Sequence, residues 1–136
     1  NSFKTEILTA VHNFTAGGAN VFNLALYTSS ATLNKSTTVY ITSGEVATAT
    51  GYTAKGKALT SVTPVLSTDT AVCDFDNISW TSASFTANGC LIFNDTATGD
   101  PACCAIAFGG DKTVTSGTFT VEFPAPAAAT AIIAIA

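Results

Sequence analysis

The side chains able to do chemistry in this chain are few, and its four cysteines and single histidine come first. Cys73, Cys90 and the adjacent Cys103 and Cys104 form no C-x-x-C pair, and His12 is far from them in sequence. Structural zinc sites normally use four cysteine or histidine ligands in close pairs, so the sequence predicts no metal site. We expect four free thiols that pack as small hydrophobic groups in a reducing compartment. One or two disulfides are the alternative, because four cysteines allow three pairings.

Nucleophilic catalysis would need a serine or cysteine beside a base that a third group holds in place. His12 is the only imidazole, and the sequence contains no G-x-S-x-G motif. We expect His12 to be solvated or locally hydrogen-bonded near a helix end. The sequence therefore predicts no catalytic residue, no cofactor and no small-molecule substrate, and we do not expect an enzyme.

Carboxylates offer the other route to catalysis, since a pair in a cleft can bind a hard cation or transfer protons. Asp74 and Asp76 are two residues apart, so on a strand they would share one face. The residues after them lack the glycine and the final glutamate of a calcium-binding loop. We expect surface carboxylates or a turn there, and keep Asp74 with Asp76, or Glu45 with Glu122, as the pairs that a polysaccharide-degrading enzyme would use.

Two weaker binding sites can be drawn from the sequence. The segment NDTATGD at residues 94–100 places Asp95 and Asp100 among hydroxyl groups, which would make a weak cation site. Trp80 and the other aromatic residues could form a platform for sugars, yet most phenylalanines occupy core-like positions in predicted strands. We expect the aromatic rings to pack in the core and keep a carbohydrate-binding module as an alternative function.

The composition limits the partners that the chain can have. Only 10% of its 136 residues are charged, with five lysines, no arginine, nine acidic residues and a formal net charge of −4; about 25% is typical of soluble domains. Such a surface is poorly suited to phosphates, so we expect neither nucleic acid nor a membrane as partner. So few charges also leave the surface and the strand edges poorly protected, which predicts that the isolated protein oligomerises or aggregates.

The hydrophobic pattern predicts the elements that carry these residues. Apolar residues recur at spacings of three and four only near the start, which predicts one helix over residues 2–14, ended by the segment AGGAN. After it, seven or eight short strands alternate with turns, among them Asn88-Gly89 and GGDK at 109–112. The last predicted strand covers residues 129–135.

We therefore expect a mainly β fold, an antiparallel β-sandwich or jelly roll with one short N-terminal helix. The length of 136 residues suits a single domain over 1–136. Residues 1–15 would form the helix or arm, and residues 20–136 the sandwich body.

A set of segments is more telling than any single site. The chain contains, in this order, FNLALYTSSATLNKSTTVY, TSGEVATATGYTAKGKALT, AVCDFDNISW, SFTANGCLIFN, AFGGDKTVTSGTFTVEFP and AIIAIA. As an ordered set they resemble a family of small virion proteins of tailed bacteriophages, over nearly the whole chain from Phe22 onward. The chain departs from that pattern in its cysteine-rich segment 101–108 and at Asn88, where such sequences often carry a base.

The resemblance implies a virion structural protein. The compact size favours a capsid cement (decoration) protein that binds the outer head surface, joins neighbouring major capsid subunits and reaches the capsid exterior after assembly in the bacterial cytoplasm. A tail or head-fibre component is the alternative. The expected partners are the major capsid protein and copies of this chain. The candidate interface residues, for which packing within the chain is the alternative, are Phe3, Ile7, Leu8 and Val11 near the start, and Ile132, Ile133 and Ile135 near the end.

Overall fold

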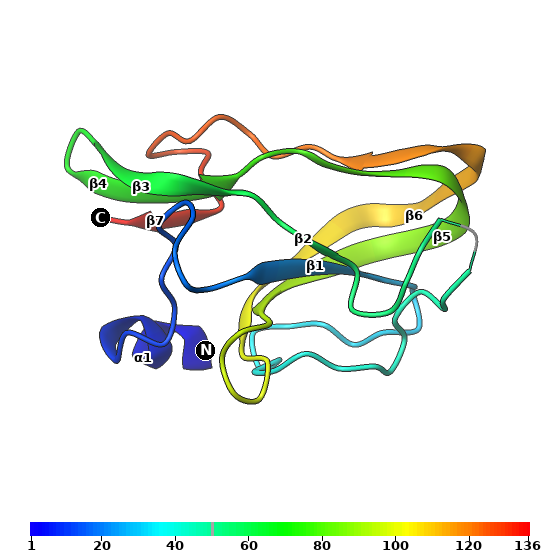
Figure 1. Ribbon diagram of the computed structural model, residues 1–136, viewed down its shortest axis with the longest axis horizontal. Coiled ribbons are helices and arrows are strands. Elements are labelled where there is room, and N and C mark those ends of the chain that lie inside the picture. The colour runs from blue at the N-terminus through cyan, green and yellow to red at the C-terminus, as the bar shows by residue number, and fades with distance from the viewer. Residues whose placement is uncertain (50) are drawn as a thin grey trace.

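The computed structural model, which describes residues 1–49 and 51–136, contains two packed antiparallel sheets and one short N-terminal helix (Figure 1). The predicted mainly β, sandwich-like fold is therefore confirmed. Thr50, which belongs to one of the segments quoted for the resemblance, lies outside the described residues.

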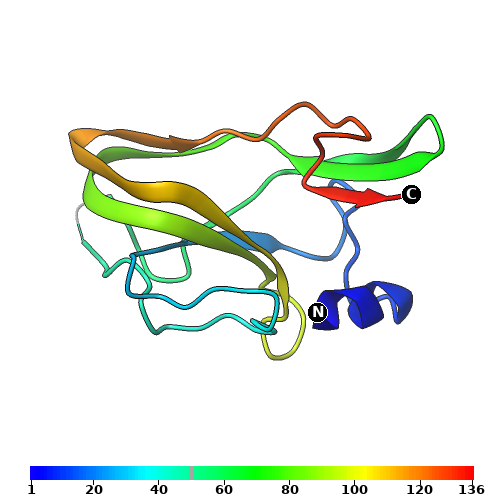
Figure 2. The same ribbon diagram turned by 180° about the vertical axis from the view of Figure 1, so that it is seen from behind.

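The larger sheet has four strands in the order β2-β1-β5-β6, all antiparallel. Strands β5 and β6 form one long hairpin that curls over the end of the molecule, so that its two halves belong to opposite layers of the sandwich (Figures 1 and 2). The strand bounds are β1 Phe22–Tyr27, β2 Lys57–Ala58, β5 Ile78–Asn94 and β6 Ala102–Val121.

The hairpin bends at an irregularity where the sequence analysis placed turns. Ala87 pairs with Lys112 and Gly89 with Ala107, so that Asn88 alone faces residues 108–111. Gly109 and Gly110 supply φ values of 73° and 140° there, which residues with side chains rarely adopt. The turns predicted at Asn88-Gly89 and at 109–112 are therefore wrong: both segments lie within strands at a bulge-like shift of register, and the short strands predicted around them merge into β5 and β6.

The smaller sheet has three strands in the order β3-β4-β7, again antiparallel. These strands are β3 Ser61–Ser67, β4 Thr70–Phe75 and β7 Ile133–Ile135. The predicted final strand thus exists, but it is shorter than 129–135.

Helix α1 covers Ser2–Leu8, so the prediction that it reaches residue 14 is wrong. Ala10 has a φ of 58°, which ends the helical path. Phe14 instead stacks face to face on Phe22 of β1, with ring centroids 4.3 Å apart. Burial of that ring in the sandwich outweighs the helical spacing of the apolar residues, because packing commonly overrides local propensity.

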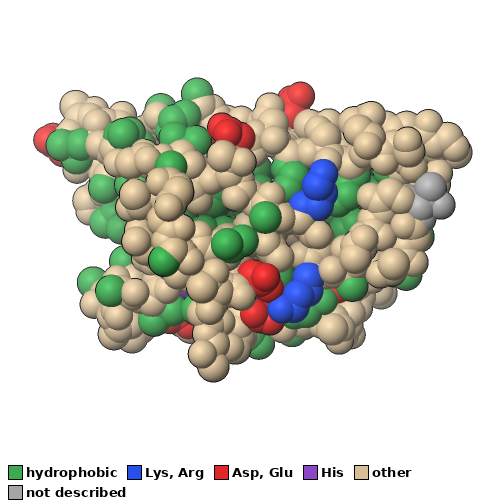
Figure 3. All heavy atoms as spheres, in the orientation of Figure 1, with side chains coloured by type: hydrophobic (Ala, Val, Ile, Leu, Met, Phe, Trp, Pro, Cys, Tyr) green, Lys and Arg blue, Asp and Glu red, His purple; other side chains and the backbone are tan. Residues whose placement is uncertain are grey.

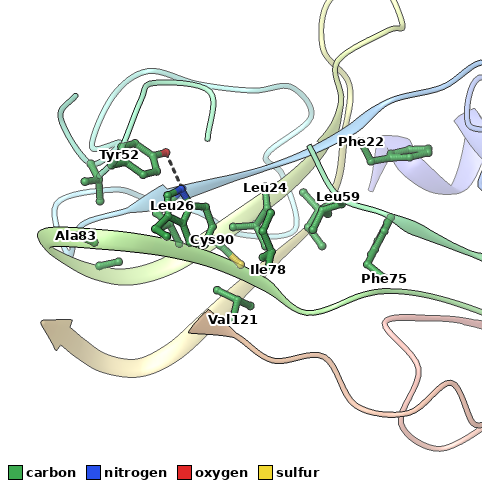
Figure 4. Packing of buried hydrophobic residues seen from close by; sticks show 14 of the residues in the cluster. Phe22, Leu24, Leu26, Tyr52, Leu59, Phe75, Ile78, Ala83, Cys90 and Val121 are labelled. Atoms are coloured by element: carbon green, nitrogen blue, oxygen red, sulfur yellow. Dashed lines mark hydrogen bonds between the residues drawn. The ribbon is translucent and has the colours of Figure 1, made fainter. Parts of the chain in front are cut away.

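The core lies on both faces of the larger sheet. The main cluster fills the space between the sheets and includes Leu24, Leu26 and Cys90 from the larger sheet with Phe75 from the smaller one (Figure 4). A second cluster packs on the opposite face beneath the segment 31–41; it contains Ala25, Tyr27, Leu91, Phe93 and Ala102. All four cysteines are free, as predicted, with two buried and two half-buried. Within the described ranges, no helix has the length and apolarity needed to cross a bilayer.

Candidate functional site

The predicted carboxylate pairs occupy different environments. Asp74 is buried in β4, with 1% of its surface exposed, whereas Asp76 is exposed beyond the end of that strand. Glu45 lies in the long connection between β1 and β2, while Glu122 is exposed just past β6. Neither pair therefore presents two matched carboxylates for acid–base work.

At the predicted cation site, Asp95 and Asp100 both bind the ammonium group of Lys55. The Nζ of Lys55 lies 2.8 Å from a carboxylate oxygen of Asp95 and 2.8 Å from one of Asp100. The same ammonium lies over the rings of Tyr40 and Phe93, at 5.6 and 5.9 Å from their centroids. Lys55 thus fastens the connection between β1 and β2 to the loop between β5 and β6.

Glu45 accepts three hydrogen bonds in the same region. Its carboxylate receives the hydroxyl of Tyr40, the hydroxyl of Tyr52 at 2.8 Å and the backbone N–H of Lys55 at 2.7 Å. The Tyr52 hydroxyl in turn accepts the N–H of Leu26 in β1 (2.9 Å; Figure 4). Burial, aided by Glu45, raises the pKa of Tyr52 above its ordinary value. We call Glu45, Lys55, Asp95 and Asp100, with Tyr40 and Tyr52, the loop clamp.

The most enzyme-like cluster surrounds His12. Its Nε2 lies 3.0 Å from the Glu6 carboxylate, and its Nδ1 lies 3.3 Å from Asn94 Nδ2 and 3.8 Å from Cys103 Sγ. This network fits a neutral imidazole that donates from Nε2 to Glu6 and accepts at Nδ1 from Asn94 and the thiol. The expected solvated His12 is wrong, because its side chain is fully buried; the hydrogen bonding is present, but most of it comes from distant strands.

Cysteine, histidine and glutamate in this order match the parts of a nucleophilic triad, but their setting does not suit catalysis. Burial raises the pKa of the Cys103 thiol, which keeps it protonated and weakly nucleophilic. The imidazole between them is sealed from solvent. The cluster instead ties down the N-terminal segment, since Asn94 Nδ2 also donates to the carbonyl of Val11. The sequence offers no signal for it, because Cys103 is 91 residues from His12.

The candidate interface residues near the start divide into packed and exposed positions. Phe3 and Ile7 pack against the main core cluster of their own chain. Val11 is half-buried. Leu8, at the end of α1, leaves 86% of its surface exposed.

The residues near the C-terminus divide in the same way. Ile132 and Ile133 pack against the main core cluster, whereas Ile135 is 54% exposed. The chain's own core therefore uses several of the proposed contacts and leaves Leu8 and Ile135 open.

A further exposed leucine joins these two at one end of the molecule. Leu66 of β3 is 72% exposed and pairs with Ala71 of β4, which pairs on its other side with Ile135. Residues opposite one another share a face, so Leu66, Ala71 and Ile135 form an apolar row across the smaller sheet. Figures 1 and 3 place this sheet and α1 at the same end, where hydrophobic side chains gather. We call Leu8, Leu66, Ala71 and Ile135 the apolar end.

Trp80 does not form a platform for sugars. The residue is 2% exposed, and its ring packs against Tyr52 and Phe119, with centroids 6.2 Å away in each case. Lys57 Nζ lies over the ring at 5.8 Å and donates to the carbonyl of Ser79. The expectation that the aromatic residues belong to the core therefore holds at this position.

No family model, curated protein or solved structure matches the chain.

Proposed function

We propose that this chain is a structural protein of a tailed-bacteriophage virion, and most specifically a capsid cement protein on the outside of the head. In this role it binds the major capsid protein and stabilises the contacts between neighbouring subunits. The resemblance of its ordered segments supports the virion assignment. The observation that carries the binding role is the apolar end: an exposed row across β3, β4 and β7, with the exposed Leu8 of α1 at the same end of the molecule (Figure 1).

The chemistry of the apolar end suits permanent contacts. Leu8, Leu66 and Ile135 are large apolar side chains left in water by a compact fold. Contiguous exposed apolar surface is typical of sites that another protein covers. A cement protein that touches several capsid subunits through small patches gains avidity, because each bound patch raises the local concentration of the next.

The test uses heads assembled without this chain, to which the purified protein is added. We expect the protein to bind in many copies over the head and to raise the temperature at which the heads release their DNA. The double variant Leu66→Asp with Ile135→Asp should lose this binding, because two charges would then have to be buried unpaired. The matched control is Ala47→Asp with Thr53→Asp, which adds the same charge at exposed positions in the connection between β1 and β2.

Three outcomes would contradict the proposal. Heads that do not bind the wild-type chain would remove the cement role. Binding restricted to a vertex or the tail would favour the tail or fibre alternative. Equal binding by the apolar-end variant and the control would remove the apolar end as the contact surface.

A further inference from the structure

A second surface lies along β6, which forms an edge of the larger sheet. The strand is 20 residues long and carries only two charged residues, Asp111 and Lys112; Glu122 follows just past its end. A long edge strand exposes unpaired backbone groups and is a template for pairing with another chain. Natural proteins protect such edges with charges, and β6 has few.

The curl of β6 creates a hollow along this edge. Its volume is about 500 Å³, and it lies between the first half of the strand in one layer and the second half in the other. Six of the apolar residues that line it are Ile106, Phe108, Phe119, Val121, Phe123 and Ile132. Apart from Val121, which is buried, each is half-buried, packing on the core with one side and open on the other. We call this hollow the β6 trough.

The charges at the trough are opposite in sign and sit ten residues apart. Lys112 pairs with Ala87 at the bend of the hairpin, while Glu122 follows Val121, which pairs with Ile78 at the far end. Both line the trough and are exposed. In the part of the chain that the structure describes, the ion pairs involve neither of them.

We propose that the β6 trough is the contact surface of a twofold dimer, in which a second copy of this chain covers it. A twofold axis places the same surface of both copies face to face in opposite directions. Residue i of the first copy then meets residue j of the second, and residue j of the first meets residue i of the second. The two troughs then face each other and shield their apolar linings from bulk water, while at the rims Lys112 of each copy meets Glu122 of its partner. The trough is therefore complementary in charge to itself, and this points to a second copy rather than to an unrelated protein.

Charge reversal tests this pairing without touching the fold, because both residues are exposed. Sedimentation equilibrium of the purified wild-type chain should show a dimer. Lys112→Glu alone, or Glu122→Lys alone, should raise the dissociation constant about tenfold, since symmetry turns two attractive pairs into two repulsive ones. The double variant Lys112→Glu with Glu122→Lys restores opposite charges and should restore the dimer. The matched control reverses the exposed Lys4 and Asp76, as Lys4→Glu with Asp76→Lys, and should leave the dimer unchanged.

The proposal is overturned if the wild-type chain remains monomeric up to about 1 mM. It is also overturned if the single reversals leave the dissociation constant unchanged, or if the double variant associates no better than the single ones. The measurement uses the purified chain alone. Its outcome is therefore independent of whether the protein is a virion component.

Discussion

The connection between β1 and β2 is held by the loop clamp, in which Lys55 pairs with two aspartates and Glu45 accepts two tyrosine hydroxyls and a backbone N–H. Along its edge, β6 borders an apolar trough, and beyond it the apolar end exposes Leu8, Leu66 and Ile135. Charged side chains are few in this chain, and the two regions differ in how many they contain. Four of the fourteen charged side chains fasten the chain's own loops in the clamp, and large apolar side chains remain in contact with water. A surface divided in this way is expected of a protein whose neighbours cover it.

The largest expected effect concerns the ionisation of two buried tyrosines near Glu45, which are Tyr27 and Tyr52. Burial raises the pKa of Tyr27 and of Tyr52 above the ordinary value, with a further contribution from Glu45. Both stay protonated in the folded protein, whereas the unfolded chain ionises near pH 10. Their contribution to stability is therefore complete below about pH 10. It falls above that pH by about 2.7 kcal/mol per unit, until the raised pKa values are reached.

This prediction is measured by urea unfolding across the alkaline range, with tyrosinate absorbance recorded in parallel. The absorbance should rise together with unfolding. Ionisation of Tyr27 and Tyr52 near pH 10 in a protein that remains folded would contradict the burial of these two side chains.

Removing the central carboxylate of the clamp should have the next largest effect. Glu45→Ala leaves the hydroxyls of Tyr40 and Tyr52 and the N–H of Lys55 without their acceptor. We expect the free energy of unfolding to fall by about 3 kcal/mol, because unsatisfied buried donors cost about 1–3 kcal/mol each. Asp76→Ala, at an exposed carboxylate, should stay within about 0.5 kcal/mol of wild type. Equal losses of stability in the two variants would contradict the conclusion that Glu45 stabilises the fold more than an exposed carboxylate does.

The ion pairs of the clamp should contribute less. Lys55 and its two partners are partly exposed, so Lys55→Met should lower the stability by about 1 kcal/mol. About 1 M salt should shrink this difference, because it screens the pairs in the wild-type protein. Lys4→Met, at an exposed lysine, is the control. A loss that does not respond to salt would point to packing of the lysine stem over Tyr40 and Phe93 instead.

The smallest effect on stability is expected at the apolar end. Leu66→Thr with Ile135→Thr keeps residues suited to strands and should change the free energy of unfolding by no more than about 0.5 kcal/mol. The same variant should be more soluble, measured as the salt concentration at which it precipitates. A loss above about 1.5 kcal/mol would mean that these side chains stabilise their own chain and are not available to others.

The sequence predicted the layered β fold and several strands well, because strands such as β1 and β4 show clear apolar runs bounded by turn residues. It failed where local signals had two meanings. Asn88-Gly89 and Gly109-Gly110 favour positive φ or tight turns, and a bulge in a long hairpin needs the same residues. Likewise the helical spacing extends to Phe14, although the chain leaves the helix after Leu8 to bury that ring.

The candidate sites were harder to predict than the fold, because their residues come from distant parts of the sequence. Lys55 is 40 and 45 residues from Asp95 and Asp100 in sequence. The segment 94–100 therefore resembles a cation-binding loop in sequence, whereas in the structure its two carboxylates bind a lysine. His12 meets Asn94 and Cys103 across more than 80 residues. Pairings of this kind depend on sheet register, which the apolar pattern alone does not specify.

The most direct test of the central claim, that the exposed apolar surface is built to be covered, is the structure of the assembled phage particle by cryo-electron microscopy. We predict many copies of this chain on the outside of the head, with Leu66 and Ile135 against a neighbouring protein. Particles without this chain, or with these two side chains facing solvent, would contradict the account.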